Sequence, residues 1–207
     1  VCRSRYFLCL IGSNRHANVI DQRELYSERV KAIRWFEDNA LEDFALYGNG
    51  WKVPQKRLGS LGKLRYRLEK IPTFFTGKPA FVSYKGVADT KFEIYSQSKF
   101  SICFENAKDI PGYVTEKIFD CLFAGCVPIY WGEPEIEKVI PRACFIDFRD
   151  FLQMPNPYEA LYSYTKNMSE ATYMEYQVAG NAFLSSSSFA PFTSEAFADS
   201  ILRPIQS

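Results

Sequence analysis

The feature of the sequence that most restricts its fold is an alternation of short apolar runs with amphipathic segments. The apolar runs have the length and content of buried strands, and in chain order they are 6–12, 44–46, 100–104, 127–131 and 143–148. The segments 21–39 and 115–124 carry apolar residues at helical spacing. Strands that alternate with helices predict an α/β fold, a Rossmann-like parallel sheet with helices on both faces and right-handed crossovers.

Weaker signals and a long tail complete the expected order of elements. Residues 80–84 predict a further short strand, and residues 91–97 predict a short helix. From 156 to the end at 207 the pattern is helical, with an interruption at the serine run 185–188. We therefore expect a single domain over 1–207 with a helical C-terminal tail.

The stretch 51–75 differs from the rest of the chain in its charge. Its basic residues oppose a single acid, Glu69, and they are Lys52, Lys56, Arg57, Lys63, Arg65, Arg67 and Lys70. Gly59, Gly62 and two nearby prolines predict that no long helix forms, so we expect an irregular basic insertion. Two interpretations stay open: contact with a membrane-bound or anionic acceptor, or a solvated surface segment.

Composition excludes several classes of protein. The net charge of +1 gives no global attraction to nucleic acid. The basic insertion also lacks the interleaved aromatic pattern of single-strand binders, so no nucleic-acid partner is expected. The chain contains no apolar run of about 18 residues, so we expect no membrane span. It begins at Val1 without the pattern of a signal peptide, and we expect it to be a piece of a longer protein.

The six cysteines predict buried thiols rather than a metal site. None forms a C-x-x-C pair, and His16 is the only histidine, so no zinc site is expected. Cys9 and Cys103, among others, sit in apolar runs, where a free thiol packs as a small hydrophobe. Free thiols favour a reducing compartment.

Two loops at the ends of expected strands are the candidate ligand-binding segments. In a parallel sheet, ligands bind at the carboxyl ends of the strands, beside helix N-termini. The first loop begins with Gly12, Ser13 and Asn14 and leads to the helix expected to carry Arg23. The second loop, 105–117, runs from the end of a strong strand into the next helix.

The second loop holds groups that suit an anion. Lys117 lies in the first turn of the expected helix, where a cation opposes the helix dipole. A bound phosphate would reverse that effect, because it is attracted to free N–H groups and to lysine together. Glu116 offers a carboxylate for ribose hydroxyls, and Tyr113 offers a ring for stacking and a hydroxyl for a phosphate.

The same residues also fit a purely structural interpretation. Thr115 followed by Glu116 is an ordinary pattern for capping a helix, and Lys117 would then be solvated. Arg23, on an amphipathic helix, would face water. Spacing alone leaves both interpretations open.

Three motifs resemble the signature of the α-1,3/1,4-fucosyltransferase family. They are Phe104-Glu105-Asn106, Gly112-Tyr113-Val114-Thr115-Glu116-Lys117 and Val127-Pro128-Ile129-Tyr130-Trp131-Gly132. Upstream, Ser13-Asn14 followed by Arg23-Glu24-Leu25-Tyr26 is similar to the family's strand-loop-arginine segment. The resemblance runs over about 6–151 and is most specific in the block 104–117.

The resemblance implies one half of a GT-B glycosyltransferase, namely the half that holds the donor, with the acceptor domain outside this chain. Arg23 and Lys117 would bind the diphosphate of GDP-fucose and stabilise the leaving group, which is the catalytic role implied. Glu116 would bind the ribose, and Asn106 and Tyr113 would hold the phosphate and fucose region. The full set implied for donor binding is Ser13, Asn14, Arg23, Glu105, Asn106, Tyr113, Val114, Thr115, Glu116 and Lys117.

The implied reaction inverts the anomeric centre of fucose. An acceptor hydroxyl attacks carbon 1 as GDP leaves, and a carboxylate of the N-terminal domain acts as general base. The resemblance implies GDP-fucose as donor substrate, no tightly bound cofactor and no metal requirement. The sequence has no DxD-like motif before a strand end, which agrees with cationic side chains in place of a metal.

The implied partners are GDP-fucose and an oligosaccharide, glycolipid or glycoprotein acceptor, as in lipopolysaccharide synthesis or protein glycosylation. The implied location is cytoplasmic, peripheral to the inner membrane, in a bacterium, or the Golgi lumen in a eukaryote. Three alternatives stay open: a GT-B transferase for another nucleotide sugar, a non-catalytic nucleotide- or glycan-binding module, and a structural domain.

Overall fold

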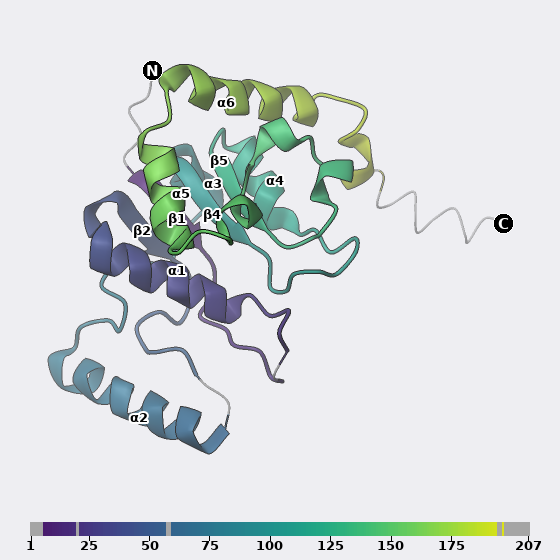
Figure 1. Cartoon of the computed structure of the whole chain (residues 1–207). Coiled ribbons are helices and arrows are strands. Elements are labelled where there is room, and N and C mark those ends of the chain that lie inside the picture. Colours follow the sequence, from purple (N-terminus) through teal and green to yellow (C-terminus); the bar gives the residue numbers. More distant parts are fainter. Residues whose placement is uncertain (1–5, 20, 57–58, 194–195, 197–207) are drawn as a thin grey trace.

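The computed structural model describes residues 6–19, 21–56, 59–193 and 196. Its centre is a sheet of six strands in the order β3-β2-β1-β4-β5-β6, in which every neighbouring pair is parallel. The strands are β1 (Tyr6–Ile11), β2 (Phe44–Tyr47), β3 (Tyr84–Gly86), β4 (Ser98–Phe104), β5 (Val127–Trp131) and β6 (Ile146–Asp147). The predicted Rossmann-like α/β fold is therefore confirmed (Figure 1).

Helices cover both faces of this sheet (Figure 1). The α-helices are α1 (Tyr26–Asn39), α2 (Gly59–Thr76), α3 (Lys91–Ser96), α4 (Glu116–Phe123), α5 (Pro157–Lys166) and α6 (Glu170–Leu184). Short 3-10 helices join them, and these are η1 (Leu41–Asp43), η2 (Ile136–Lys138), η3 (Arg142–Cys144), η4 (Phe148–Phe151) and η5 (Ala190–Phe192).

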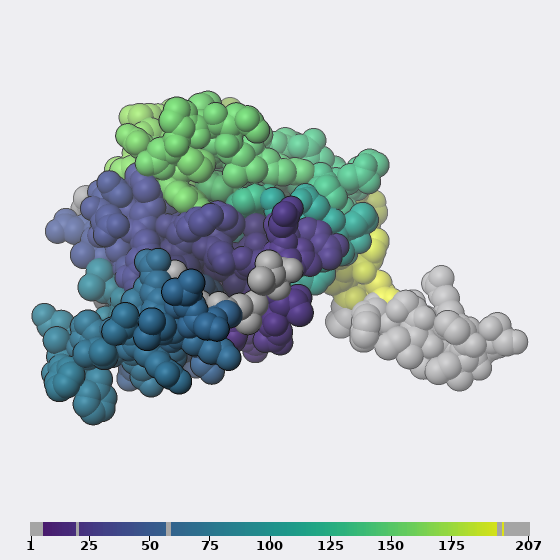
Figure 2. Space-filling view, turned by 60° about the horizontal axis from the view of Figure 1, so that its bottom comes forward, coloured from purple at the N-terminus to yellow at the C-terminus, as the bar shows by residue number. Residues whose placement is uncertain are grey.

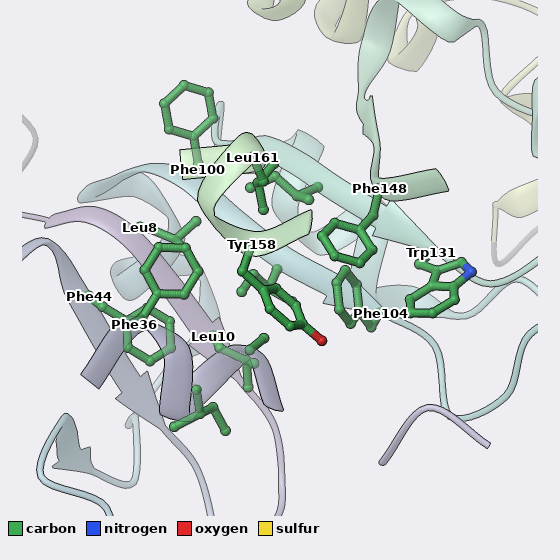
Figure 3. Packing of buried hydrophobic residues seen from close by; sticks show 14 of the residues in the cluster. Leu8, Leu10, Phe36, Phe44, Phe100, Phe104, Trp131, Phe148, Tyr158 and Leu161 are labelled. Carbon is green, nitrogen blue, oxygen red and sulfur yellow. The ribbon is translucent and has the colours of Figure 1, made fainter. Parts of the chain in front are cut away.

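The strand β1 shows why both faces must be covered. Leu8 and Leu10 point into one buried cluster and Cys9 points into another, as the two-residue period of a strand requires. In the first cluster, Phe36 of α1 and Tyr158 of α5 pack over the leucines (Figure 3). Helices α3, α4 and α6 supply side chains to the second cluster. A strand that is buried on both faces reads as a continuous apolar run.

The chain order reverses beside β1, which lies between β2 and β4. From β1 the chain builds outward to β2 and β3, and it then returns to add β4, β5 and β6 on the other side. Such a switch point opens a crevice at the carboxyl ends of the two central strands. The loops after β1 and β4 are the two segments that the sequence selects, and the fold places them at this crevice.

The prediction of a strand over 80–84 is wrong in its position, because the strand β3 covers Tyr84–Gly86. Phe81 is buried and packs edge-on against Trp51, with the ring centroids 5.0 Å apart. The backbone N–H and the hydroxyl of Ser83 both donate to Glu37 Oε1, at 3.0 and 2.8 Å. These contacts hold the segment beside the sheet, so the strand β3 begins only at Tyr84.

The expected strand 143–148 is much shorter than predicted. Only Ile146–Asp147 pairs with β5, and the 3-10 helices η3 and η4 flank it. The guanidinium of Arg142 donates to the carbonyl of Phe145 over 2.9 Å, and the carboxylate of Asp147 accepts the backbone N–H of Arg149 over 2.9 Å. Both bonds satisfy backbone groups locally, so the apolar run does not extend as a strand.

The prediction of an irregular insertion over 51–75 is also wrong, because Gly59–Thr76 forms α2. Gly59 is the first residue of that helix, so its φ of 77° does not break the helical backbone that follows. The residues 63–71 between Gly62 and Pro72 are mostly Leu, Lys, Arg and Glu, which favour helices. An ion pair of Arg65 with Glu69, one turn apart, adds to this.

The ends of the other helices depart less from expectation. The helix predicted over 21–39 begins at Tyr26, and residues 21–25 form a turn before it. The predicted helical tail consists of α5, α6 and η5, and α6 ends at Leu184 beside the serine run, as expected. The expected tail residues 194–195 and 197–207 lie outside the described residues.

The five cysteines that the structure describes are free and buried, which confirms the expectation for them, while Cys2 lies outside the described residues. Among the helices of the described chain, none combines the length and the apolar character needed to cross a bilayer.

Candidate functional site

A cavity of about 350 Å³ opens at the switch point of the sheet. The loop after β1 lines it with Gly12, Ser13 and Arg15, and α1 lines it with Tyr26 and Arg29. The other walls come from the ends of β2 and β3, from α3 and from the start of α4. The cavity therefore occupies the place where a doubly wound sheet binds its ligand.

Gly48, which directly follows β2, allows the loops after β1 and β2 to approach each other closely at the cavity. Its φ is 126°, and a Cβ at this position would collide with the carbonyl oxygen of Gly12. The backbone N–H of Gly12 in turn donates to the carbonyl of Tyr47 over 3.0 Å. The loops after β1 and β2 thus touch through glycine backbones, which only glycine permits at this φ.

A buried carboxylate lies at the start of α4. The side chain of Glu105 is fully buried, and its Oε1 accepts the backbone N–H of Thr115 over 2.9 Å. The Thr115 hydroxyl lies 2.7 Å from Glu105 Oε2, and the ammonium of Lys117 lies 2.7 Å from the same oxygen. The carboxylate thus offsets the unfavourable position of Lys117 near the positive end of the helix dipole.

Lys117 is partly committed to this network and partly available to the cavity. Its side chain is 16% exposed, and its Nζ donates to Glu105 and, over 2.9 Å, to the hydroxyl of Thr115. An ammonium group has three hydrogens. Since Lys117 lines the cavity, the third donor can serve a bound anion. Lys117 is not freely solvated, so that part of the structural interpretation does not apply.

Arg29, on α1, is a second cation at the cavity, and the sequence analysis missed it. It is only 5% exposed, and its Nη2 donates to Oδ1 of Asn106 over 2.9 Å. Its buried Nε has no hydrogen-bond partner among the residues described. Burial lowers the pKa of Arg29, while the nearby Tyr26 and Glu105 act in the opposite direction. A guanidinium nevertheless remains charged at neutral pH. A buried charged group with an unused donor suits an anionic ligand.

Asn106 connects the two loops across the switch point. Its Oδ1 accepts from Arg29, and its Nδ2 donates to the hydroxyl of Tyr113 over 3.1 Å. Its backbone carbonyl accepts the N–H of Leu25 over 3.0 Å, next to an antiparallel bridge of Glu24 with Ala107. Asn106 lines the cavity, whereas Tyr113 is not part of the lining and contacts the amide of Asn106 through its hydroxyl.

Arg23 lies outside this cavity. It sits in the turn before α1, its side chain is 54% exposed, and it pairs with Asp21 over 2.9 Å. That pairing lowers the pKa of Asp21 to about 2. The expectation that Arg23 sits on the helix is therefore wrong, and its role in donor binding stays a prediction. The structure brings Arg29, rather than Arg23, into the cavity that Lys117 lines.

Glu116 borders the cavity at its exposed side. Its carboxylate lies 3.3 Å from the ammonium of Lys91, which also pairs with Asp120 over 2.9 Å. Burial raises the pKa of Glu116, but its own backbone N–H and Lys91 outweigh burial, so the pKa lies below its usual value. At neutral pH Glu116 is therefore an anion that accepts hydrogen bonds from hydroxyl groups.

Of the remaining predicted site residues, some line the cavity and others hold the surrounding loops and core in place. Ser13 and Thr115 line the cavity. The amide of Asn14 donates to the carbonyls of Gly50 and Val53, at 3.0 and 2.8 Å, and so anchors the loop after β1. Val114 packs against the second core cluster. Within the described residues no group of three or more His, Cys, Asp or Glu is placed to hold a metal, and the lack of a metal requirement stays a prediction.

Comparison with known proteins identifies the family. The model of the C-terminal part of glycosyltransferase family 10 (fucosyltransferase) matches residues 45–183. The alpha-(1,3)-fucosyltransferase FucT of Helicobacter pylori is 48% identical over 61 residues, which are 30% of this chain and 13% of that protein. A putative fucosyltransferase-like protein of Arabidopsis thaliana is 33% identical over 92 residues, which are 42% of this chain and 18% of that protein. The chain thus matches only a small part of these relatives.

Solved structures share the fold. A crystal structure of an α1,3-fucosyltransferase with GDP-fucose aligns with 84% of this chain and 38% of its own, with a TM-score of 0.52 and 22% identity. The same kind of enzyme with GDP gives a TM-score of 0.50 over 38% of its chain, also at 22% identity. These likenesses concern the fold, whereas the family model covers well over half of the 207 residues. The chain therefore belongs to glycosyltransferase family 10, the fucosyltransferases.

Proposed function

We propose that this chain is the donor-binding half of an inverting fucosyltransferase, which transfers L-fucose from GDP-fucose to a glycan hydroxyl. The observation that carries the proposal is a pair of largely buried cations, Arg29 and Lys117, that line one cavity at the switch point. Two findings support this choice of donor: the chain belongs to the fucosyltransferase family, and a structurally similar α1,3-fucosyltransferase was solved with GDP-fucose.

The diphosphate of the donor would lie between Lys117 and Arg29, at the amino end of α4. Glu105 balances the charge of Lys117, whereas the guanidinium of Arg29 on the other wall bonds, among the described residues, only the neutral amide of Asn106, so the site keeps a net positive charge. An anion in the cavity would balance the positive charge of the Arg29 guanidinium. We assign the diphosphate arginine to Arg29, because Arg23 would first have to leave Asp21 and move into the cavity.

The nucleoside would extend from the diphosphate toward the open side of the cavity. Glu116 is placed there as the acceptor for ribose hydroxyls. Val87, Ala88 and Tyr95 supply the apolar surface of the same cavity, which suits the face of a purine ring.

The proposed chemistry places the accelerating charges around the leaving group. The acceptor oxygen forms a bond to carbon 1 of fucose, the bond from carbon 1 to the phosphate oxygen breaks, and the acceptor proton passes to a carboxylate base. We place that base in a part of the enzyme outside this chain, as the resemblance implies. Negative charge grows on the diphosphate in the transition state, where fixed cations are most effective.

The acceptor would be an oligosaccharide, free or carried by a lipid or a protein. The comparisons include a GDP-fucose protein O-fucosyltransferase 3 of Homo sapiens, 43% identical over 54 residues, which are 26% of this chain and 11% of that protein. An acceptor carried by a protein is therefore consistent with what the name of this relative says.

Calorimetric titration of the chain with GDP-fucose, GDP-mannose and UDP-glucose tests the proposal. We expect GDP-fucose to bind most tightly, GDP-mannose to bind more weakly through the shared GDP group, and UDP-glucose to bind much more weakly or not at all. Equal binding of all three would favour a transferase for another nucleotide sugar, and no binding of any nucleotide would favour a structural domain. Binding without turnover, once the acceptor domain is restored, would favour a non-catalytic module.

A further inference from the structure

The helix α2 stands apart from the body of the domain. It spans Gly59–Thr76, and none of its residues is buried. Figure 1 shows α2 below the sheet, joined to it by coil segments. In Figure 2 the same helix, in blue, protrudes on the face that is turned forward. An 18-residue helix without a buried side chain needs another reason for its amphipathic sequence.

The sides of α2 are reversed relative to an ordinary surface helix. Its half-buried positions recur at helical spacing and are Gly62, Tyr66, Glu69 and Thr73. This stripe, which is mostly polar, is the side of the helix that is least exposed. Thr73 and Glu69 also border the shallow hollows between α2 and residues 52–54 and 78–80.

The apolar residues of α2 are on the exposed side. They follow helical spacing over the length of the helix and are Leu61, Leu64, Leu68, Ile71 and Phe75, with exposures of 83, 52, 56, 48 and 80%. At 100° per residue they form one stripe roughly opposite the half-buried side. Phe74, 81% exposed, lies near its edge. A stripe this long is more than the scattered exposed leucines of ordinary protein surfaces.

Basic side chains flank the apolar stripe. Lys63, Arg67 and Lys70 lie along one flank, one turn from each other, and all three are exposed. Arg65 lies on the other flank and pairs over 2.8 Å with Glu69, the only acid in the helix. The exposed side of α2 is thus apolar in the middle, with a net positive charge along the flank of Lys63, Arg67 and Lys70 and a paired arginine at the other edge.

This charge pattern selects one kind of occupant. Apolar side chains between basic ones match the interface of an anionic bilayer, where the stripe enters the acyl boundary and the cations meet lipid phosphates. A second copy of the helix would cover the stripe, but it would bring basic flanks together. An apolar protein groove would leave the flanking cations without partners.

We propose that α2 is a peripheral membrane anchor, which lies in the plane of an anionic lipid surface with Leu61, Leu64, Leu68, Ile71 and Phe75 inserted. The segment that carries α2 leaves the sheet at the carboxyl end of β2, where Gly48 and Asn49 line the donor cavity. The anchor therefore holds the edge of the sheet that carries the cavity near the lipid surface. This proposal does not depend on which nucleotide the cavity binds.

Sedimentation of the 207-residue chain with lipid vesicles tests the anchor. We expect it to sediment with vesicles of phosphatidylcholine and phosphatidylglycerol, much less with phosphatidylcholine alone, and less as salt increases. The double variant Leu64→Glu with Leu68→Glu should lose vesicle binding. Val178→Glu, at a 62% exposed apolar residue on α6, is the matched control and should keep it.

A second pair of variants tests the basic flank. Replacing Lys63, Arg67 and Lys70 together by Gln should weaken binding to anionic vesicles on the order of 100-fold, since each such charge contributes about a factor of 5. Replacing Lys31, Lys138 and Lys166 by Gln removes three exposed lysines elsewhere and should change binding little. The midpoint of thermal unfolding should be the same in the α2 variants as in the wild type, because α2 contributes no buried side chain.

Three results would overturn the proposal. One is that the wild-type chain fails to sediment with anionic vesicles while its unfolding is normal. Another is that the control variants lose as much binding as the α2 variants. The third is a dimer in size-exclusion chromatography that the Leu64→Glu and Leu68→Glu changes dissolve, which would assign the stripe to a second copy.

Discussion

The ammonium of Lys117 lies 2.7 Å from Oε2 of Glu105, and the side chain of Glu105 is completely buried. A carboxylate at the end of β4 therefore holds the cation at the amino end of α4, and the cation faces the cavity at the switch point. This pair explains how the domain keeps a lysine at an unfavourable place in a helix before any donor binds. It also means that a bound diphosphate shares Lys117 with Glu105.

Arg29 should bind the diphosphate more directly than Arg23. Replacing Arg29 by Met keeps the buried stem but removes the charge, and we expect GDP affinity to fall about 10- to 100-fold, the effect of losing a charge-assisted hydrogen bond. The matched change Arg23→Met, at an exposed ion pair, should cost less than about threefold. Calorimetric titration with GDP measures both, and a larger loss in Arg23→Met would contradict the assignment.

Glu105 should contribute strongly to folding. Replacing it by Ala leaves Lys117 buried without its partner, and we expect the free energy of unfolding to fall by about 3–5 kcal/mol. Urea unfolding measures this, with Glu135→Ala, at an exposed ion pair with Lys138, as the control, for which about 0.5 kcal/mol is expected. Excess GDP should restore part of the loss, because the diphosphate supplies an anion to Lys117. Equal effects of the two substitutions would show that the pair carries little energy.

Glu116 should recognise the ribose. Glu116→Gln should weaken GDP binding about 10-fold, because hydroxyl groups lose a charged acceptor. The same substitution should have little effect on a GDP analogue that lacks the ribose hydroxyls. A loss of the same size with this analogue would show that Glu116 acts elsewhere, for example through its contact with Lys91.

The stability of the domain should fall in alkaline solution, in part because of Cys144. Burial raises the pKa of this thiol from 9.0 to about 11. A raised folded pKa means that the thiol's contribution is complete below pH 9 and is lost as pH rises toward 11. The loss amounts to about 1.4 kcal/mol per pKa unit. The difference in unfolding free energy between wild type and Cys144→Ala should shrink from pH 8 to pH 10.5, and a constant difference would contradict this.

The sequence was most informative where one physical signal dominated. Continuous apolar runs identified β1, β4 and β5, because strands buried on both faces have few polar positions. The loops after β1 and β4 followed from strand order alone. Phe81 shows where this fails, since an apolar residue can be buried against Trp51 without joining a strand.

Arg29 and α2 were missed for different reasons. Arg29 lies in the buried stripe of α1, together with Ile33 and Phe36, and a charge within an apolar stripe was the signal that could have identified it. In α2, the weight given to Gly59, Gly62 and Pro72 concealed a run of good helix formers between them. Neither tertiary contacts nor the direction of a helix face can be obtained from residue types alone.

The crystal structure of this chain with GDP tests the central claim most directly. We predict diphosphate oxygens within about 2.7–3.2 Å of Lys117 Nζ and of the Arg29 guanidinium, at the amino end of α4. A diphosphate bound beside Arg23, or a corner that remains closed by the Glu105 network while GDP binds elsewhere, would contradict it.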